Sequence, residues 1–345
     1  MLEERKKEMS VLEPSELAAS APSSASGTVL PRETKPNILY FLADDIGLVY
    51  RPWNEQSPLD APNIADLAEH GTVFTQMYSD CALCAPSRYA TLTGNHAHRG
   101  GSPTGVWSFG PNAKHMVRDG QRTLGEMLQV QGYATYFAGK WHLGGGGRSS
   151  DDPTRLAGGP IDFGFNDSRT LWRGLGEAPH VLFDHDRDRP SADAPPYQDY
   201  SPCHPDMSEP AMDFAEPSPL GWSSMVDWDH ADRWVSAVGP CLASWARRTI
   251  KNAPTPFFLY YASASAHAPF RPPVRFLDKG PVRGVSNISN IADMMLETDR
   301  ALGTLVKALQ DRSLLASTII VFTSDNGQVS TGNGQPICDD KEPSY

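Results

Sequence analysis

The stretch Ile38-Leu39-Tyr40-Phe41-Leu42-Ala43, followed at once by Asp44-Asp45, decides the fold class of this chain. An unbroken apolar run that stops abruptly at charged residues is typical of a strand buried in a sheet, rather than of an amphipathic helix. Strands of this kind belong to mainly parallel sheets that helices cover on both faces. The stretch therefore predicts an α/β protein.

The same pattern recurs along the chain. Further strand-like runs are Tyr133 to Ala138, Phe257 to Ala262 and Ile319 to Phe322. Two shorter helices are expected, one over Pro62 to Glu69, closed by Gly71, and one that begins at the capping box of Thr123 and Glu126 and ends at Gly132. Two longer helices are expected over Asp229 to Arg248 and between Ile291 and Asp311. Gly239-Pro240 could interrupt the first of these longer helices. The alternation predicts a large, mainly parallel central sheet flanked by helices.

Polar residues follow each of the predicted strands. They are Asp44-Asp45, Lys140-Trp141-His142, His267-Ala268-Pro269 and Asp325-Asn326-Gly327. Each group alone also suits a turn or a solvated strand end. Because ligands bind at the carboxyl edge of open α/β sheets, their recurrence favours one shared site.

A second informative run is Cys84-Ala85-Pro86-Ser87-Arg88, which Thr93-Gly94 follows. Pro86 suits the first turn of a helix and Gly94 the residue just past its end, so Cys84 is predicted at a helix N-terminus. Free N–H groups and the helix dipole favour an anion there. A bare cysteine at such a place is usually a buried thiol or half of a disulfide. The complete run favours a more specific chemistry.

The run C-x-P-S-R resembles the core signature of the type I sulfatases, which belong to the alkaline phosphatase superfamily. The resemblance covers residues 36 to 345 and is strongest to the arylsulfatase A and N-acetylgalactosamine-6-sulfatase branch. It implies an alkaline-phosphatase-like sandwich, and we expect the family's small C-terminal domain to be missing. In that family the cysteine matching Cys84 is oxidised to formylglycine, whose hydrate attacks the sulfur of a sulfate ester.

The resemblance also implies a metal site. The matching ligands are Asp44, Asp45, Asp325 and Asn326, together with the formylglycine made from Cys84. These side chains offer oxygen ligands, which hard divalent cations require. We therefore expect Ca²⁺, with Mg²⁺ as the alternative.

Further catalytic residues are implied by other family elements. Gly139 to Gly144 is similar to the GKWHLG element, which assigns Lys140 and His142, and His267 matches the histidine of the H-x-P element. Lys341 begins a stretch resembling K-x-x-x-Y-E-G-G, of which the chain contains only Lys341 to Tyr345. Arg88, one turn after Cys84, can reach back toward the nucleophile. A glycine-rich turn, a structural histidine and a solvated lysine are the plainer readings of these residues.

Composition excludes several classes of protein. A formal net charge of -11 argues against a general nucleic-acid binder, which needs basic stripes. No stretch approaches the ~20 apolar residues of a membrane span. We expect residues 1–35 to form a flexible tail without an evident secretory signal, which leaves localisation open. Residues 36–345 should form the catalytic domain, with a loop-rich insertion at about 144–256.

The sequence thus predicts an arylsulfatase-like sulfuric ester hydrolase. Its partners would be an aryl sulfate or sulfated sugar as substrate and a formylglycine-generating enzyme during maturation. Two alternatives stay open: a phosphodiesterase or phosphonate hydrolase of the same superfamily, and a non-catalytic pseudo-sulfatase that binds sulfated glycans.

Overall fold

The computed structural model describes residues 35–47, 57–101, 115–145, 156–175, 182–185 and 228–328. Within them, one sheet contains β1 (Asn37–Ala43), β2 (Ala134–Lys140), β3 (Asp167–Leu171), β4 (Leu182–His185), β5 (Phe257–Ala262) and β6 (Thr318–Ser324). The strand order is β4-β3-β2-β5-β1-β6. All pairs are parallel except β3 with β4. The prediction of a mainly parallel sheet is confirmed.

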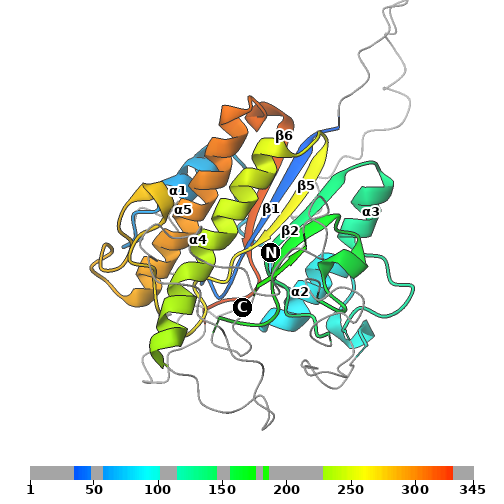
Figure 1. The fold of residues 1–345 in the computed structure, drawn as a ribbon, viewed down its shortest axis with the longest axis horizontal. Coiled ribbons are helices and arrows are strands. Elements are labelled where there is room, and N and C mark those ends of the chain that lie inside the picture. The colour runs from blue at the N-terminus through cyan, green and yellow to red at the C-terminus, as the bar shows by residue number, and fades with distance from the viewer. Residues whose placement is uncertain are drawn as a thin grey trace, which may run out of the picture. The chain divides into compact units, whose positions relative to one another are not determined.

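Helices cover both faces of this sheet. They are α1 (Pro62–Glu69), α2 (Cys84–Thr93), α3 (Leu124–Val130), α4 (Trp228–Asn252) and α5 (Asn290–Asp311), with short 3-10 helices at Ala97–Arg99, Pro160–Phe163, Leu277–Lys279 and Leu315–Ser317. Figure 1 shows α1, α4 and α5 on one face and α2 and α3 on the other. The result is a three-layer arrangement, as the alternation of strands and helices predicts.

Two apolar cores explain why the strands are apolar throughout. Side chains alternate between the two faces of a strand, so Leu39 and Phe41 of β1 join the core under α4 and α5. Leu42, on the opposite face of the same strand, joins the core under α2 and α3. β5 divides in the same way, with Leu259 in one core and Tyr260 in the other.

The predicted helix ends are confirmed where the sequence signals were strong. α2 begins at Cys84, and Gly94 ends it with a left-handed φ of 68° while its N–H donates to the Ala90 carbonyl at 2.8 Å. Thr123 and Glu126 form both hydrogen bonds of the capping box at the start of α3. α2 therefore presents its N-terminus, with Cys84, at the carboxyl edge of the sheet.

The sequence was less informative between residues 144 and 256. β3 and β4 lie there although no strand was predicted, because β3 buries polar side chains such as Ser168, Arg169 and Thr170 and lacks an apolar run. α4 passes through Gly239-Pro240 without interruption. A proline removes one backbone hydrogen bond, but the buried face of α4, packed against α5, keeps the helix whole.

The cysteines of the described part differ in state. Cys81 and Cys84 are free thiols, whereas Cys241 of α4 is disulfide-bonded. Cys84 is therefore buried but not held in a disulfide.

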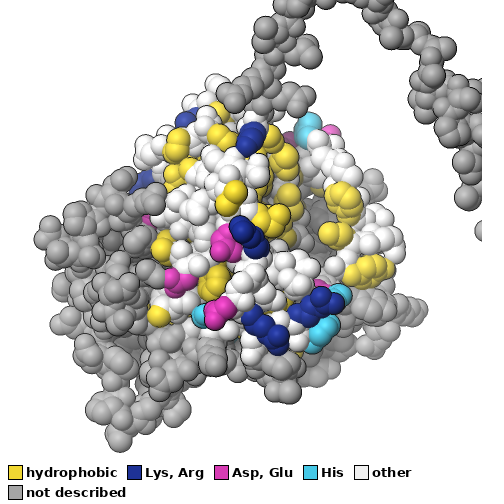
Figure 2. All heavy atoms as spheres, turned by 90° about the vertical axis from the view of Figure 1, so that its right-hand side faces the viewer, with side chains coloured by type: hydrophobic (Ala, Val, Ile, Leu, Met, Phe, Trp, Pro, Cys, Tyr) yellow, Lys and Arg dark blue, Asp and Glu magenta, His cyan; other side chains and the backbone are white. Residues whose placement is uncertain are grey.

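None of the helices in the described ranges is long and apolar enough to cross a membrane. Figure 2 shows the side of the molecule that carries α3, where basic side chains lie among acidic, histidine and hydrophobic ones. Among the described residues of this face, basic side chains form no continuous stripe. The expectation that nucleic acid is not a partner stays a prediction.

Candidate active site

Asp44 and Asp45 lie at the carboxyl end of β1, and both are buried. The Asp44 N–H donates to the Ser265 carbonyl at 3.2 Å, and the Asp45 N–H donates to Asp325 Oδ1 at 3.1 Å. Asp45 has a φ of 57°, a left-handed conformation that few residues other than glycine, asparagine and aspartate adopt. The chain therefore turns at this point, and the neighbouring strand ends hold both carboxylates in place.

Cys84 faces these carboxylates from the start of α2. Its Sγ lies 3.6 Å from Asp44 Oδ1 and 3.9 Å from Asp45 Oδ1. Burial, followed by the charge of Asp44, raises the pKa of the thiol well above its usual range. Unmodified Cys84 is thus a protonated thiol, which is a poor nucleophile.

Arg88 connects α2 with three strand ends from a fully buried position. Its Nε donates to Asp325 Oδ2 at 3.0 Å, and its Nη2 lies 2.8 Å from the same oxygen and 3.3 Å from Asp44 Oδ1. Its Nη1 donates to the Lys140 carbonyl at 2.8 Å. Burial disfavours the charge, but Asp325 and Asp44 outweigh it and raise the pKa of Arg88. The guanidinium therefore stays charged.

Lys140 and His142 come from the end of β2. Lys140 Nζ donates to Asp44 Oδ2 at 2.7 Å in a fully buried ion pair. His142 is also buried, with a φ of 58°. Burial, then the charges of Lys140 and Arg88, lowers the pKa of His142 well below its usual range. His142 is therefore held in its neutral form.

His267 lies on the loop after β5, where its side chain is 27% exposed. Its Nδ1 is 2.6 Å from the Ala268 carbonyl, and because a carbonyl only accepts, Nδ1 carries a hydrogen. Its Nε2 lies 3.8 Å from Asp45 Oδ2. Nε2 is therefore the ring nitrogen that faces the carboxylates at the edge of the site.

Asp325 and Asn326 follow β6 directly. The Asp325 N–H donates to the Ala43 carbonyl at 3.0 Å, which places it beside the end of β1. Asn326 Nδ2 donates to Asp45 Oδ1 at 2.5 Å, whereas Asn326 Oδ1 is buried and has no hydrogen-bond partner in the described part of the chain. A buried acceptor without a donor is costly unless another group satisfies it.

The charges of the cluster are unevenly matched. Burial raises the pKa of Asp44, but Lys140 and Arg88 outweigh burial and bring it below its usual value. Burial and the charge of Asp44 raise the pKa of Asp325. Three carboxylates, including that of Asp45, face two buried cations, so one net negative charge remains.

The donor set fits a hard divalent cation. Asp44, Asp45 and Cys84 form a buried group whose potential ligand atoms all lie within 4.8 Å of one another. The unpartnered Asn326 Oδ1 and the excess negative charge are the two features that a cation would satisfy. With a dication, one net positive charge would remain, which favours an anionic substrate.

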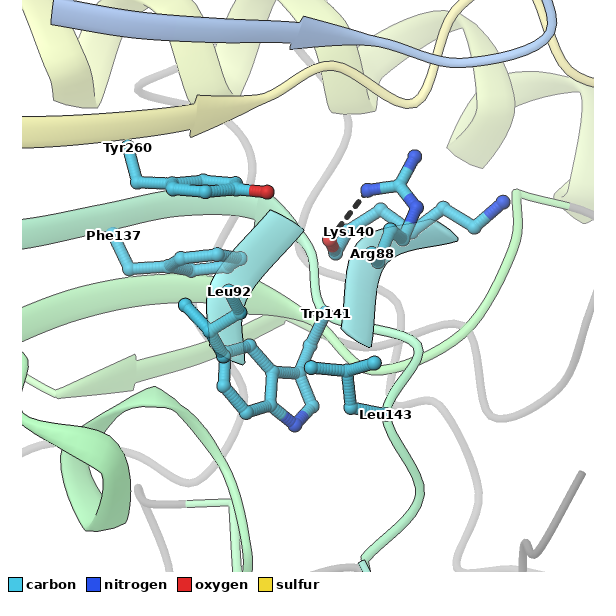
Figure 3. A pocket seen from close by; sticks show the side chains of 7 residues that line it. All are labelled: Arg88, Leu92, Phe137, Lys140, Trp141, Leu143 and Tyr260. Atoms are coloured by element: carbon cyan, nitrogen blue, oxygen red, sulfur yellow. Dashed lines mark hydrogen bonds between the residues drawn. The ribbon is translucent and has the colours of Figure 1, made fainter. Parts of the chain in front are cut away.

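A small cavity lies behind the cations, between α2 and β2 (Figure 3). Its lining residues are Arg88, Leu92, Phe137, Lys140, Trp141, Leu143 and Tyr260. The rings of Phe137 and Tyr260 stack with centroids 5.4 Å apart, and in Figure 3 the Tyr260 hydroxyl points toward the Arg88 guanidinium. This wall is mostly apolar and lowers the local dielectric, which strengthens the electrostatic effect of both cations.

The structure brings the predicted site residues of the described ranges to one edge of the sheet. They are Asp44, Asp45, Cys84, Arg88, Lys140, His142, His267, Asp325 and Asn326. Lys341 lies outside the described residues. Sequence reasoning missed Tyr260 and Ser265, which are ordinary strand and loop residues that no motif marks.

The chain matches the Sulfatase family over residues 36–343 and belongs to that family. This confirms the resemblance seen in the C-x-P-S-R run. Among its relatives, arylsulfatase A of Bos taurus is 32% identical over 301 residues, covering 86% of this chain and 53% of the relative. The N-acetylgalactosamine-6-O-sulfatase of Bacteroides thetaiotaomicron is 28% identical over 314 residues, covering 86% and 59%. The chain spans about half the length of the curated relatives it matches.

Solved structures support the fold. A Bacteroides thetaiotaomicron sulfatase, described under the metabolism of multiple glycosaminoglycans, superposes with a TM-score of 0.63 at 24% identity, covering 86% of this chain and 63% of its own. A Pseudoalteromonas sp. sulfatase gives 0.59 at 23% identity, covering 85% and 55%. The expected alkaline-phosphatase-like architecture is confirmed.

Proposed function

We propose that this chain carries the active site of a sulfuric ester hydrolase that works through formylglycine made from Cys84. One observation carries the proposal. Cys84 begins α2 with its Sγ 3.6 and 3.9 Å from two buried carboxylates, beside the buried cations Arg88 and Lys140. Membership of the Sulfatase family supports it. The raised pKa of the unmodified thiol makes catalysis by Cys84 itself a weaker explanation.

A divalent cation completes the proposed site. Its ligands would be Asp44, Asp45, Asp325 and Asn326, with the modified residue 84, and Ca²⁺ is the first candidate and Mg²⁺ the second. When bound, the cation supplies positive charge for a sulfate oxygen and acidifies the hydroxyl at position 84.

The protein side chains have separate tasks in this proposal. Arg88 stabilises the negative charge of the oxygen at position 84, and Lys140 faces the sulfate oxygens. His267 holds at Nε2 the proton that the leaving oxygen needs. Neutral His142 accepts the proton whose removal from the second hydroxyl at position 84 lets sulfate leave. Lys341 is proposed to assist the leaving group.

The proposed substrate is an aryl sulfate or a sulfated sugar. This proposal is supported by the names of two relatives, arylsulfatase A and N-acetylgalactosamine-6-O-sulfatase, which refer to an aryl sulfate and to a sulfated sugar. Maturation would need a formylglycine-generating enzyme that acts on Cys84. Because Cys84 is a free thiol in the folded chain, no disulfide blocks that reaction.

The test is turnover of an aryl sulfate by protein produced with a formylglycine-generating enzyme. We expect many turnovers for the wild type, none for Cys84→Ala, and at most one equivalent of phenol for Cys84→Ser. Serine supplies one hydroxyl but not the second that permits release. Sustained turnover by Cys84→Ser would contradict the aldehyde mechanism.

An aryl phosphodiester and a sulfated oligosaccharide serve as comparison ligands in the same test. Faster cleavage of the phosphodiester than of the sulfate would favour phosphoryl transfer. Oligosaccharide binding that survives Cys84→Ala, in a wild type that cleaves no sulfate ester, would favour a binding protein.

A further inference from the structure

Glu297 is a buried carboxyl group that the proposed chemistry does not use. It lies in the middle of α5, 3% exposed, and its Oε2 accepts a hydrogen bond from Ser265 Oγ at 2.7 Å. Within the described ranges no Lys, Arg or His forms an ion pair with it. A buried carboxyl without a cation is costly, so its presence calls for an explanation.

Gly239 of α4 packs closely against the carboxyl group of Glu297. A Cβ at position 239 would lie 1.7 Å from Glu297 Oε1. Glycine weakens a helix interior, and here it stands beside Pro240 in the middle of α4. The two covering helices therefore enclose the carboxyl at a cost to the local stability of α4.

Ser265 connects Glu297 with the end of β1 at the candidate site. Its carbonyl accepts from the Asp44 N–H at 3.2 Å and from Thr298 Oγ1 at 3.4 Å. The next N–H, that of Ala266, donates to the Asp44 carbonyl at 2.7 Å. The loop after β5 is thus bonded on one side to α5 and on the other to the strand end that carries the metal-site carboxylates.

His267 lies two residues beyond Ser265 on the same loop. Its Nε2 is 3.8 Å from Asp45 Oδ2, whereas the bond between Ser265 and Glu297 is made behind the sheet edge, on α5. A displacement of this short loop would move the imidazole relative to the leaving oxygen. Misplacement by about 1 Å is enough to cost roughly 100-fold in rate.

We propose that Glu297 is a positioning residue, which through Ser265 fixes the loop that carries His267 against the end of β1. The proposal rests on the proposed function only for its catalytic consequence. The anchoring itself is a property of the folded chain and can be measured without turnover.

The anchor works as an uncharged acceptor. Burial raises the pKa of Glu297 to about 8, against which the Ser265 hydrogen bond acts. The groups that face it are the Tyr261 phenol of β5, the Ser265 hydroxyl and the backbone of Gly239, and Asp293 and Arg300 flank it on α5. Glutamine, which has the same shape and no charge, should therefore replace it.

The experiment compares wild type with Ser265→Ala, Glu297→Ala and Glu297→Gln. Asp299→Asn is the matched control, because Asp299 is a buried carboxyl of the same helix that instead caps α1 through the N–H groups of Asn63 and Ile64. The first readout is amide hydrogen exchange of peptides covering residues 263–268. The second is kcat for aryl sulfates whose leaving groups differ in pKa.

We expect Ser265→Ala and Glu297→Ala to speed exchange of this loop and to lower kcat roughly 10- to 100-fold for poor leaving groups, with less effect on good ones. Glu297→Gln should keep both readouts near wild type, and Asp299→Asn should leave loop exchange unchanged. Unchanged exchange and leaving-group dependence in Ser265→Ala, a mild substitution that should fold, would overturn the proposal. If the wild type cleaves no sulfate ester, the exchange data still decide the anchor, while the proposed function fails separately.

Discussion

The free energy of unfolding should depend on pH through Glu297, and Glu297→Gln removes that dependence. Burial raises the pKa of this carboxyl in the folded chain from 4.5 to about 8. Between pH 4.5 and about pH 8, Glu297 keeps its proton in the folded state and has lost it in the unfolded state. The folded state thus binds more protons than the unfolded state, so stability falls as pH rises through this window. Below pH 4.5 both states are protonated and the effect vanishes.

The size of the effect follows from the shift. A difference of about 3.5 pKa units at about 1.36 kcal/mol per unit corresponds to about 5 kcal/mol across the full window. Between pH 5 and pH 8 roughly 4 kcal/mol of this should be visible, which is a large part of the stability of an ordinary domain. Because Glu297 is buried, solvent screening does not reduce this free-energy difference.

Urea unfolding of wild type and Glu297→Gln at several pH values measures the difference directly. We expect the stability of the glutamine variant, relative to wild type, to rise by several kcal/mol from pH 5 to pH 8. Ser265→Ala removes a hydrogen bond that lowers the pKa of Glu297, so it should extend the window to higher pH. Parallel pH dependences of wild type and Glu297→Gln would refute the reasoning.

Four further substitutions test the fold and the charge cluster. Gly139→Ala should destabilise by about 3 kcal/mol or more in thermal unfolding, because its φ is 117° and a Cβ would lie 1.7 Å from a carbonyl oxygen of β5. Gly120→Ala, with φ of 80° but open space around it, should cost only about 1 kcal/mol. Thr123→Ala removes the capping box of α3, and a loss of about 1 kcal/mol in urea unfolding is expected. Lys140→Met removes the shorter of the two buried ion pairs of Asp44 and leaves only Arg88 at 3.3 Å, so about 3 kcal/mol should be lost, and unchanged stability would contradict the buried ion pair.

The sequence predicted the parts of the fold whose signals are local. Two such signals are the apolar run that ends at Asp44-Asp45 and the pair of Pro86 and Gly94 near the two ends of α2. Both can be recognised from adjacent residues, because they depend on hydrophobicity and on local backbone preferences. The edge of the sheet could be predicted as the site because parallel strands must end together.

The remainder depends on contacts between distant segments. β3 was not predicted because Arg169 and its neighbours become acceptable in a strand only when the rest of the fold buries and pairs them. The hydrogen bond between Ser265 and Glu297 could not be predicted from the sequence either. Both are common residue types, and they meet only when α5 packs behind β5. The helix predicted over Asp229 to Arg248 is present, and the interruption that Gly239-Pro240 could have caused does not occur because tertiary packing outweighs one lost hydrogen bond.

The most direct test of the central claim is the mass of the peptide that contains residue 84. The protein should be produced in a host that has the formylglycine-generating system, beside a sulfatase known to be modified there. The account predicts that the Cys84 thiol is replaced by an aldehyde or its hydrate. An unmodified Cys84 beside a fully converted control would contradict it.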